Sequence, residues 1–183
     1  MGLNIEDLDV PLDRDLFTRT LIRHLSGTLE DVVGLEEASG YIAIVGATVG
    51  EELNREYRRA LAVSQLSRRQ VTDVLVDLKR RIQGNFFIIE EAEDYVVLGN
   101  THCPFGDKVV GRRSLCMMTS NVFGHLAAEN LGYGKVELRE TIAEGHPECR
   151  VIVYFRPSGE AEKADGRTYM KVENPNALYS AGS

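Results

Sequence analysis

The sequence contains no tryptophan, and only five prolines and three cysteines among its 183 residues. So little proline excludes a proline-rich recognition segment. Few cysteines in an odd number exclude a disulfide-stabilised scaffold. No hydrophobic run reaches the roughly 18–20 residues that span a bilayer, and the N-terminus lacks the basic and apolar segments of a secretory signal. We therefore expect a cytoplasmic protein with no membrane partner, whose cysteines are reduced thiols, metal ligands or reactive groups.

Positive charge is also scarce relative to negative charge. Lysine and arginine total 21 against 28 aspartates and glutamates, which gives a net charge of −7. A molecule of this charge repels nucleic acids as a whole, so we expect no nucleic-acid partner. Hydrophobic residues make up 43% and charged residues 27%, as in ordinary globular proteins. The length allows one domain with its own core and is too short for two of full size.

Helical periodicity dominates the first half of the chain. Residues 14–33 have apolar side chains at spacings of three and four, which predicts a helix with one buried stripe: Leu16, Phe17, Leu21, Leu25, Leu29 and Val32. A second helical stretch covers 35–63, and its segment 40–50 is almost entirely apolar and rich in small residues. Because a helix that is apolar all round is buried all round, we place this segment in the core or in a dimer interface.

A third helix is predicted from Ser67 to Ile82. Ser67 is a suitable N-cap, and the inward positions are Val71, Val74, Leu75 and Leu78. The basic run Lys79–Arg81 at its end is interpreted as a solvated helix face.

The second half of the chain is richer in β-structure. The predicted elements are a hairpin, a helix and a second hairpin, at residues 85–91 with 94–99, 113–131, and 135–142 with 150–155. This order predicts an α+β fold, in which N-terminal helices pack on a small antiparallel sheet. The apolar pattern ends after Arg156. We therefore predict a single domain over residues 1–156 and a flexible C-terminal tail over 157–183.

All three cysteines fall near the boundaries of these elements. Cys103 follows the first hairpin, Cys116 lies in the first turn of the fourth helix, and Cys149 begins the last strand. Such places can converge at one end of an antiparallel sheet, and converging thiolates are good ligands for zinc or an iron–sulfur cluster. His146 is a candidate fourth ligand, whereas His102 adjoins Cys103 too closely for both to bind easily. The alternative is that each cysteine is a small buried hydrophobic side chain.

Three motifs surround these cysteines: Cys103-Pro-Phe-Gly, Ser114-Leu-Cys-Met, and a stretch over 135–151 that contains Glu-Thr-Ile-Ala-Glu-Gly-His-Pro-Glu-Cys. They resemble the vinyl-4-reductase superfamily, and the whole chain looks most like its methanogen output domain type, which occurs in signalling proteins. The same motifs also resemble the aminothiazoline-carboxylate hydrolase-like family. The resemblance covers residues 85–155. It implies a ligand- or metal-binding α+β domain that forms a homodimer through its N-terminal helices.

The resemblance also implies where a metal would bind. Aromatic-sensing members of the superfamily hold zinc with a cysteine on the helix, a Glu-x-x-Cys pair and a final cysteine on the last hairpin. Cys116 and Cys149 match this pattern, but the glutamate falls at Leu138 and the middle cysteine at Thr141. Because that zinc site is incomplete, we expect a different centre on Cys103, Cys116 and Cys149: an iron–sulfur cluster, with zinc as the alternative.

Two functions follow from these observations. The first is a signal-sensing output domain that binds the metal centre or a small apolar ligand between sheet and helices, and signals through its N-terminal helices to a dimer partner or another signalling protein. The second is a small-molecule hydrolase or carbon–sulfur enzyme that uses Cys103 or Cys116 as its nucleophile. The helix N-terminus and two neighbouring arginines would favour the Cys116 thiolate, and His102 or His146 would be the general base. A dimeric adaptor whose cysteines only pack is the third reading.

Overall fold

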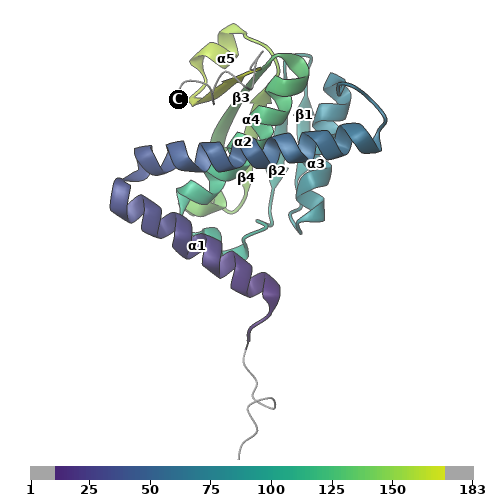
Figure 1. Ribbon diagram of the computed structural model, residues 1–183. Helices are drawn as coiled ribbons and strands as arrows, with labels where there is room; N and C mark the ends of the chain where they lie inside the picture. Colours follow the sequence, from purple (N-terminus) through teal and green to yellow (C-terminus); the bar gives the residue numbers. More distant parts are fainter. Residues whose placement is uncertain (1–10, 172–183) are drawn as a thin grey trace, which may run out of the picture.

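The computed structural model describes residues 11–171, and its helices and strands follow in the order shown in Figure 1. The elements are α1 (Arg14–Val33), α2 (Leu35–Ala60), α3 (Arg68–Arg81), β1 (Phe87–Glu91), β2 (Tyr95–Asn100), the 3-10 helix η2 (Gly106–Val109), α4 (Arg113–Leu131), β3 (Tyr133–Glu140), the 3-10 helix η3 (Ile142–Glu144), β4 (Cys149–Tyr154), α5 (Gly159–Lys163) and β5 (Gly166–Met170). Within the described range, no helix has the length and apolar content needed to cross a membrane.

The strands form one antiparallel sheet in the order β1-β2-β4-β3-β5. The pairs β1–β2 and β3–β4 are the two predicted hairpins, and α4 lies between them in the chain. Strand β4 is central, and its Val151 lies opposite Leu98 of β2 and Leu138 of β3. The predicted α+β fold is therefore confirmed.

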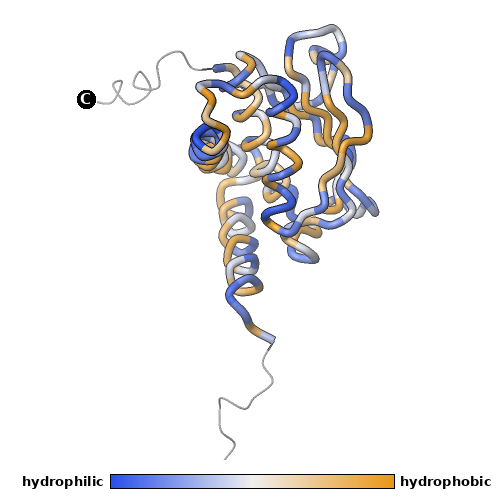
Figure 2. The backbone as a smooth tube through the Cα atoms, turned by 90° about the vertical axis from the view of Figure 1, so that its right-hand side faces the viewer, coloured by the Kyte–Doolittle hydropathy of each residue, from blue (hydrophilic) through white to orange (hydrophobic). Residues whose placement is uncertain are grey.

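The elements stack in layers, with α2 outermost, α3 and α4 beneath it, and the sheet behind them (Figures 1 and 2). Alternate strand residues face the helices and form the main core, which includes Val96, Leu98, Val151, Val153, Leu75 and Phe123. The intervening residues Val97, Ile152 and Tyr154 face the other way and pack with Ala161 of α5. The period of two along a strand sorts these side chains between the two faces.

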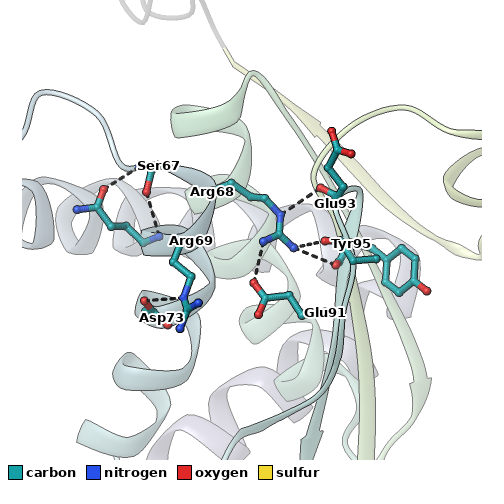
Figure 3. A network of polar contacts seen from close by, with 9 residues as sticks. Ser67, Arg68, Arg69, Asp73, Glu91, Glu93 and Tyr95 are labelled. Carbon is teal, nitrogen blue, oxygen red and sulfur yellow. Dashed lines mark hydrogen bonds and ion pairs between the residues drawn. The ribbon is translucent and has the colours of Figure 1, made fainter.

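The start of α3 is fixed by polar contacts (Figure 3). Ser67 is its N-cap as predicted, and forms a capping box with Gln70. The Arg68 guanidinium donates to the Glu93 carbonyl at 3.1 Å and pairs with the Glu91 carboxylate at 2.7 Å. These bonds attach α3 to the turn between β1 and β2. They therefore help to position the later residues of α3 relative to the sheet.

Helix α2 contacts α4 through its small residues. Ala38, Ile42, Gly46 and Gly50 are buried at a spacing of four, and a Cβ on Gly46 would overlap the Asn121 side chain of α4. The opposite face carries Tyr41, Ile44, Val45 and Val49, which are exposed. The segment 40–50 is thus buried on the side that packs on α4 and exposed on the other. Our expectation of burial on all sides is wrong for the single chain.

Helix α1 has the predicted bounds but not the predicted burial. Much of its apolar stripe is exposed: Phe17 by 57%, Leu21 by 55%, Leu25 by 70% and Val32 by 76%. The buried positions of the helix are instead Ser26 and Gly27. The apolar period predicted the helix correctly, but in one chain few elements lie against that stripe.

The described part of the predicted C-terminal tail, residues 157–171, contains a short helix and a strand. Residues Gly159–Lys163 form α5, and Gly166–Met170 form β5, which pairs with β3. The Tyr169 ring lies directly over Gly124 of α4, where any Cβ would overlap it. These elements escape prediction because they are short and polar, and are held by pairing with a strand far away in sequence. The remainder of the predicted tail, 172–183, lies outside the described residues.

Candidate functional site

Cys103, Cys116 and Cys149 line one small cavity of about 30 Å³. It lies between α3, α4, the inner face of the sheet and the loop that follows β2. Its other walls are mostly apolar, including Phe86, Phe105, Leu115 and Val151. The structure therefore brings together the three thiols that the sequence places far apart.

Each cysteine is placed by a different element. Cys149 begins β4 opposite Asn100 of β2, and its Sγ receives the Ile142 backbone N–H at 3.4 Å and the Asn100 Nδ2 at 3.9 Å. Cys116 lies in the first turn of α4. Cys103 is in the loop after β2, which the Gly106 N–H closes by donating to the Cys103 carbonyl at 2.8 Å.

Two other cavity residues are those at which the family resemblance placed the missing zinc ligands. Leu138 of β3 and Thr141, which follows that strand, line the cavity together with Cys116 and Cys149. All four positions therefore surround the same space in this fold. Two of them carry an apolar and a hydroxyl side chain here, so the chemistry of the space differs from that of the implied zinc site.

Lys79 of α3 is the cavity residue that sequence reasoning missed. Its side chain is 4% exposed, and its Nζ donates to Thr119 Oγ1 at 2.8 Å. Burial lowers the pKa of Lys79 to about 8, an effect that the nearby cysteines partly oppose. The interpretation of this residue as solvated is wrong. It lies one helical turn after the buried Leu75, so the apolar period could have identified it.

Burial shifts Cys103 and Cys116 away from the reactive thiolate form. Burial raises the pKa of Cys116 to about 12 and also raises the pKa of Cys103. We expected the N-terminus of α4 to favour a Cys116 thiolate, but desolvation outweighs that effect. Burial therefore disfavours the thiolate at Cys103 and Cys116, the two residues that the enzyme hypothesis would use as nucleophile.

Within residues 11–171, the cavity is lined by the three cysteines but by no histidine, aspartate or glutamate that could serve as a fourth metal ligand. His146 and His102 are exposed and do not line the cavity. Across residues 11–171, no three His, Cys, Asp or Glu side chains are grouped so that they could hold an ion. The iron–sulfur and zinc assignments stay predictions.

The walls of the cavity also support the two N-terminal helices. Ile22 of α1 packs with Cys103, Phe105 and Cys116 in one apolar cluster. The next residue, Arg23, donates to the Val110 carbonyl at 3.0 Å and also to the Lys108 carbonyl, both in the loop that bounds the cavity. Helix α4 supports α2 through the small-residue contact described above. A displaced wall would therefore reach both helices.

A larger groove of about 590 Å³ lies elsewhere, between the end of α2 and α3. It is open and apolar for the most part, and it contains a polar group at one side. There the Tyr57 hydroxyl donates to Asp77 Oδ2 at 2.7 Å, and Arg81 Nε donates to the same oxygen at 2.5 Å. These hydrogen bonds, led by that of Arg81, lower the pKa of Asp77 to about 2. The groove lacks the thiols and the buried amine, so we take the smaller cavity as the site.

Comparisons with known proteins agree with the architecture. A family model described as methanogen output domain 1 matches residues 21–154. The phenol-responsive sensory domain of the transcription activator PoxR, in complex with phenol, is similar in structure with a TM-score of 0.58 and 14% identity, over 88% of each chain. A trafficking protein particle complex subunit 3 from Naegleria fowleri, covalently bound to palmitic acid, has a TM-score of 0.54 and 11% identity, over 77% of this chain and 96% of that one. No curated protein matches the chain in sequence.

Proposed function

Because this chain belongs to the methanogen output domain 1 family, we propose that it is a sensory domain whose cysteine cavity binds a small ligand and whose N-terminal helices transmit the occupancy. The observation that carries the proposal is that α1 packs on residues that line the cavity, while α2 packs on α4, the helix that supplies three of the lining residues. Two proteins with this fold have ligands, phenol in the PoxR sensory domain and palmitic acid in the trafficking subunit. Those ligands belong to those proteins, and what they support here is the use of such a fold for small-molecule binding.

The size of the cavity supplies the physical link between binding and signal. About 30 Å³ is room for roughly two water molecules. A ligand larger than this enters only if a wall moves. The rigid, close-packed sheet resists displacement more than the loop after β2 or the first turn of α4 does. Helix α1 packs on both of these walls, and α2 packs on the next turns of α4, so ligand entry displaces the helices.

The output surface in this proposal is the exposed apolar face of α1 and α2, which pairs with a second copy. Its residues are Phe17, Leu21, Leu25, Val32, Tyr41, Ile44 and Val45, all at least half exposed. Figure 2 shows hydrophobic stretches along α1 where it extends away from the sheet. Monomeric proteins seldom leave such a row uncovered. A two-fold pair is self-complementary, because each copy offers the same stripe to the other.

Substitution of one cavity residue tests the link without any ligand. Cys116→Met adds atoms inside the cavity and mimics occupancy, whereas Cys116→Ser keeps the size of the side chain and is the matched control. We expect hydrogen exchange in residues 14–60 to change by several-fold in Cys116→Met and to stay near wild type in Cys116→Ser. If exchange changes only in α3, α4 and the sheet, the cavity does not communicate with the N-terminal helices and the proposal fails.

A metal centre at the same cysteines is the second candidate, favoured by the meeting of three thiols in one cavity. Metal and sulfide analysis of protein purified without oxygen, with its absorption spectrum, is the measurement. Stoichiometric iron and sulfide that disappear in the three Cys→Ser variants would establish an iron–sulfur cluster. About one zinc per chain would support the alternative, and metal-free protein would leave the small ligand as the occupant.

A further inference from the structure

We infer that the ligand of the cysteine cavity is a small monocarboxylic acid, whose carboxylate pairs with the buried ammonium of Lys79 while its short apolar body contacts the thiols. This inference rests on the proposed function, because it names the chemistry of the ligand for the same cavity. It follows from one buried ammonium that has no carboxylate partner among residues 11–171.

Lys79 is the one charged side chain among the described residues that line the cavity. The ammonium has three N–H donors, and its one hydrogen bond within residues 11–171 is to Thr119 Oγ1. The Phe86 and Phe123 rings lie 5.4 and 5.3 Å from Nζ, so their faces offset part of the charge. The groups that act on its charge are the three cysteines, and no carboxylate of the described residues is among them.

An unpaired buried charge is strongly destabilising, and proteins rarely retain one without a use for it. Burial raises the pKa of the Cys103 and Cys116 thiols, which disfavours the thiolate that would pair with the ammonium at these two positions. An anion from outside would neutralise the ammonium and accept its two remaining N–H groups. The ligand therefore carries one acidic group and not two, since the cavity offers a single cation.

The other walls of the cavity indicate the polarity and the size of the rest of the ligand. Most of the lining is hydrocarbon, from residues such as Leu115, Leu138 and Val151, and its few polar groups include Asn100 and Thr141. A strongly polar body would therefore recover little of the hydration that it loses on entry. The limited volume restricts that body to a few atoms unless the loop moves. Propionate has both properties, a single carboxylate and a short alkyl group, and it serves as the probe. Propionamide has the same shape without the charge.

The test is a titration of the full chain with propionate and with propionamide, followed by calorimetry and by chemical shifts at Cys116 and Thr119. We expect propionate to bind about 10- to 100-fold more tightly than propionamide, as for the loss of a hydrogen bond to a charged group. Lys79→Met should abolish this preference. The matched control Lys163→Met removes an exposed lysine of α5 and should leave the preference unchanged.

Three results would overturn the inference. Equal binding of the two probes to the wild-type chain would show that charge plays no part, and this comparison needs no variant to fold. Propionate binding that survives in Lys79→Met would place it elsewhere. Thiolate absorbance in the wild-type chain that disappears in Lys79→Met would show that a cysteine balances the charge. None of these results depends on the exchange experiment with Cys116→Met, so the inference and the proposed function fail separately.

Discussion

The two faces of α2 differ in the size of their side chains: the face that packs on α4 carries small residues, and the exposed face carries large apolar ones. One face carries Gly46 and Gly50 and lies directly on α4. The other carries Ile44 and Val45, which are 67% and 50% exposed. Small residues let two helices of one chain approach closely, whereas large apolar residues bury area when a separate surface arrives later. The small residues of α2 thus form a folding contact within the chain, and its large exposed residues form the surface that we propose for association.

The largest expected effect is on stability, and it comes from placing a side chain in the close contact between α2 and α4. Gly46→Leu forces a branched side chain against Asn121 and should lower the free energy of unfolding by about 2–3 kcal/mol. Val45→Leu, one residue away on the exposed face, should change it by less than about 0.5 kcal/mol. Urea unfolding of both variants measures the difference. Equal destabilisation by the two substitutions would remove the distinction between the faces.

The next effect is on association rather than on folding. Ile44→Glu should weaken the pairing of two copies by about 1–2 kcal/mol, or roughly tenfold, because the apolar area of Ile44 is replaced by a charge. The stability of the separated chain should stay nearly unchanged. Sedimentation velocity across a concentration series measures the dissociation constant. A wild-type chain that stays monomeric at every concentration would show that this face does not pair with itself.

A stabilising substitution is expected on the exposed side of the same segment. Gly40 is exposed, and a Cβ there would meet no atom within 4 Å. Gly40→Ala should raise the free energy of unfolding by up to about 1 kcal/mol, since alanine loses less backbone entropy in a helix. The measurement is urea unfolding at low protein concentration. Destabilisation of the monomer would indicate a contact that the single chain does not show.

The smallest effect concerns the C-terminal end of α2, where Tyr57 contacts α3 through its hydrogen bond to Asp77. The folded pKa of Asp77, about 2, lies below its ordinary value of 3.8, so its contribution to stability is present above pH 4 and lost as the pH falls toward 2. Asp77→Asn should lose less stability than wild type across that window. The difference should be under about 1 kcal/mol, because Arg80 and Arg81 are exposed. Identical acid curves would mean that the group contributes nothing.

Local pattern was sufficient to predict most elements. The bounds of α1 and α4 and the Ser67 cap follow from helical period, capping chemistry and glycine at the helix ends. Both hairpins follow from short β-rich runs separated by polar turns. These signals act over a few residues, so a single sequence contains them. The positions of the three cysteines at element boundaries likewise indicated a shared site.

The remaining features depend on tertiary contacts, which the local sequence pattern does not contain. Strand β5 is held by pairing with β3, some thirty residues earlier in the chain, and its own residues are mostly exposed. Lys79 has a charged side chain of the kind usually found at the surface, but it occupies a position on the inward face of α3, and it is buried in the structure. The stripe of α1 has the pattern of a core but few elements lie against it. In each case the deciding neighbour lies far away in sequence.

The position of Tyr169 over Gly124 also determines where the folded unit could be cut or fused without loss of its contacts. A recombination point at residue 156, where the apolar pattern ends, would separate α4 from the ring that covers it and leave β3 without its edge partner. A junction after Met170 keeps both contacts within the transferred segment. Any sequence fused at that point is joined to the strand that Tyr169 holds on α4. The helix that lines the cavity would therefore be mechanically connected to downstream as well as upstream segments.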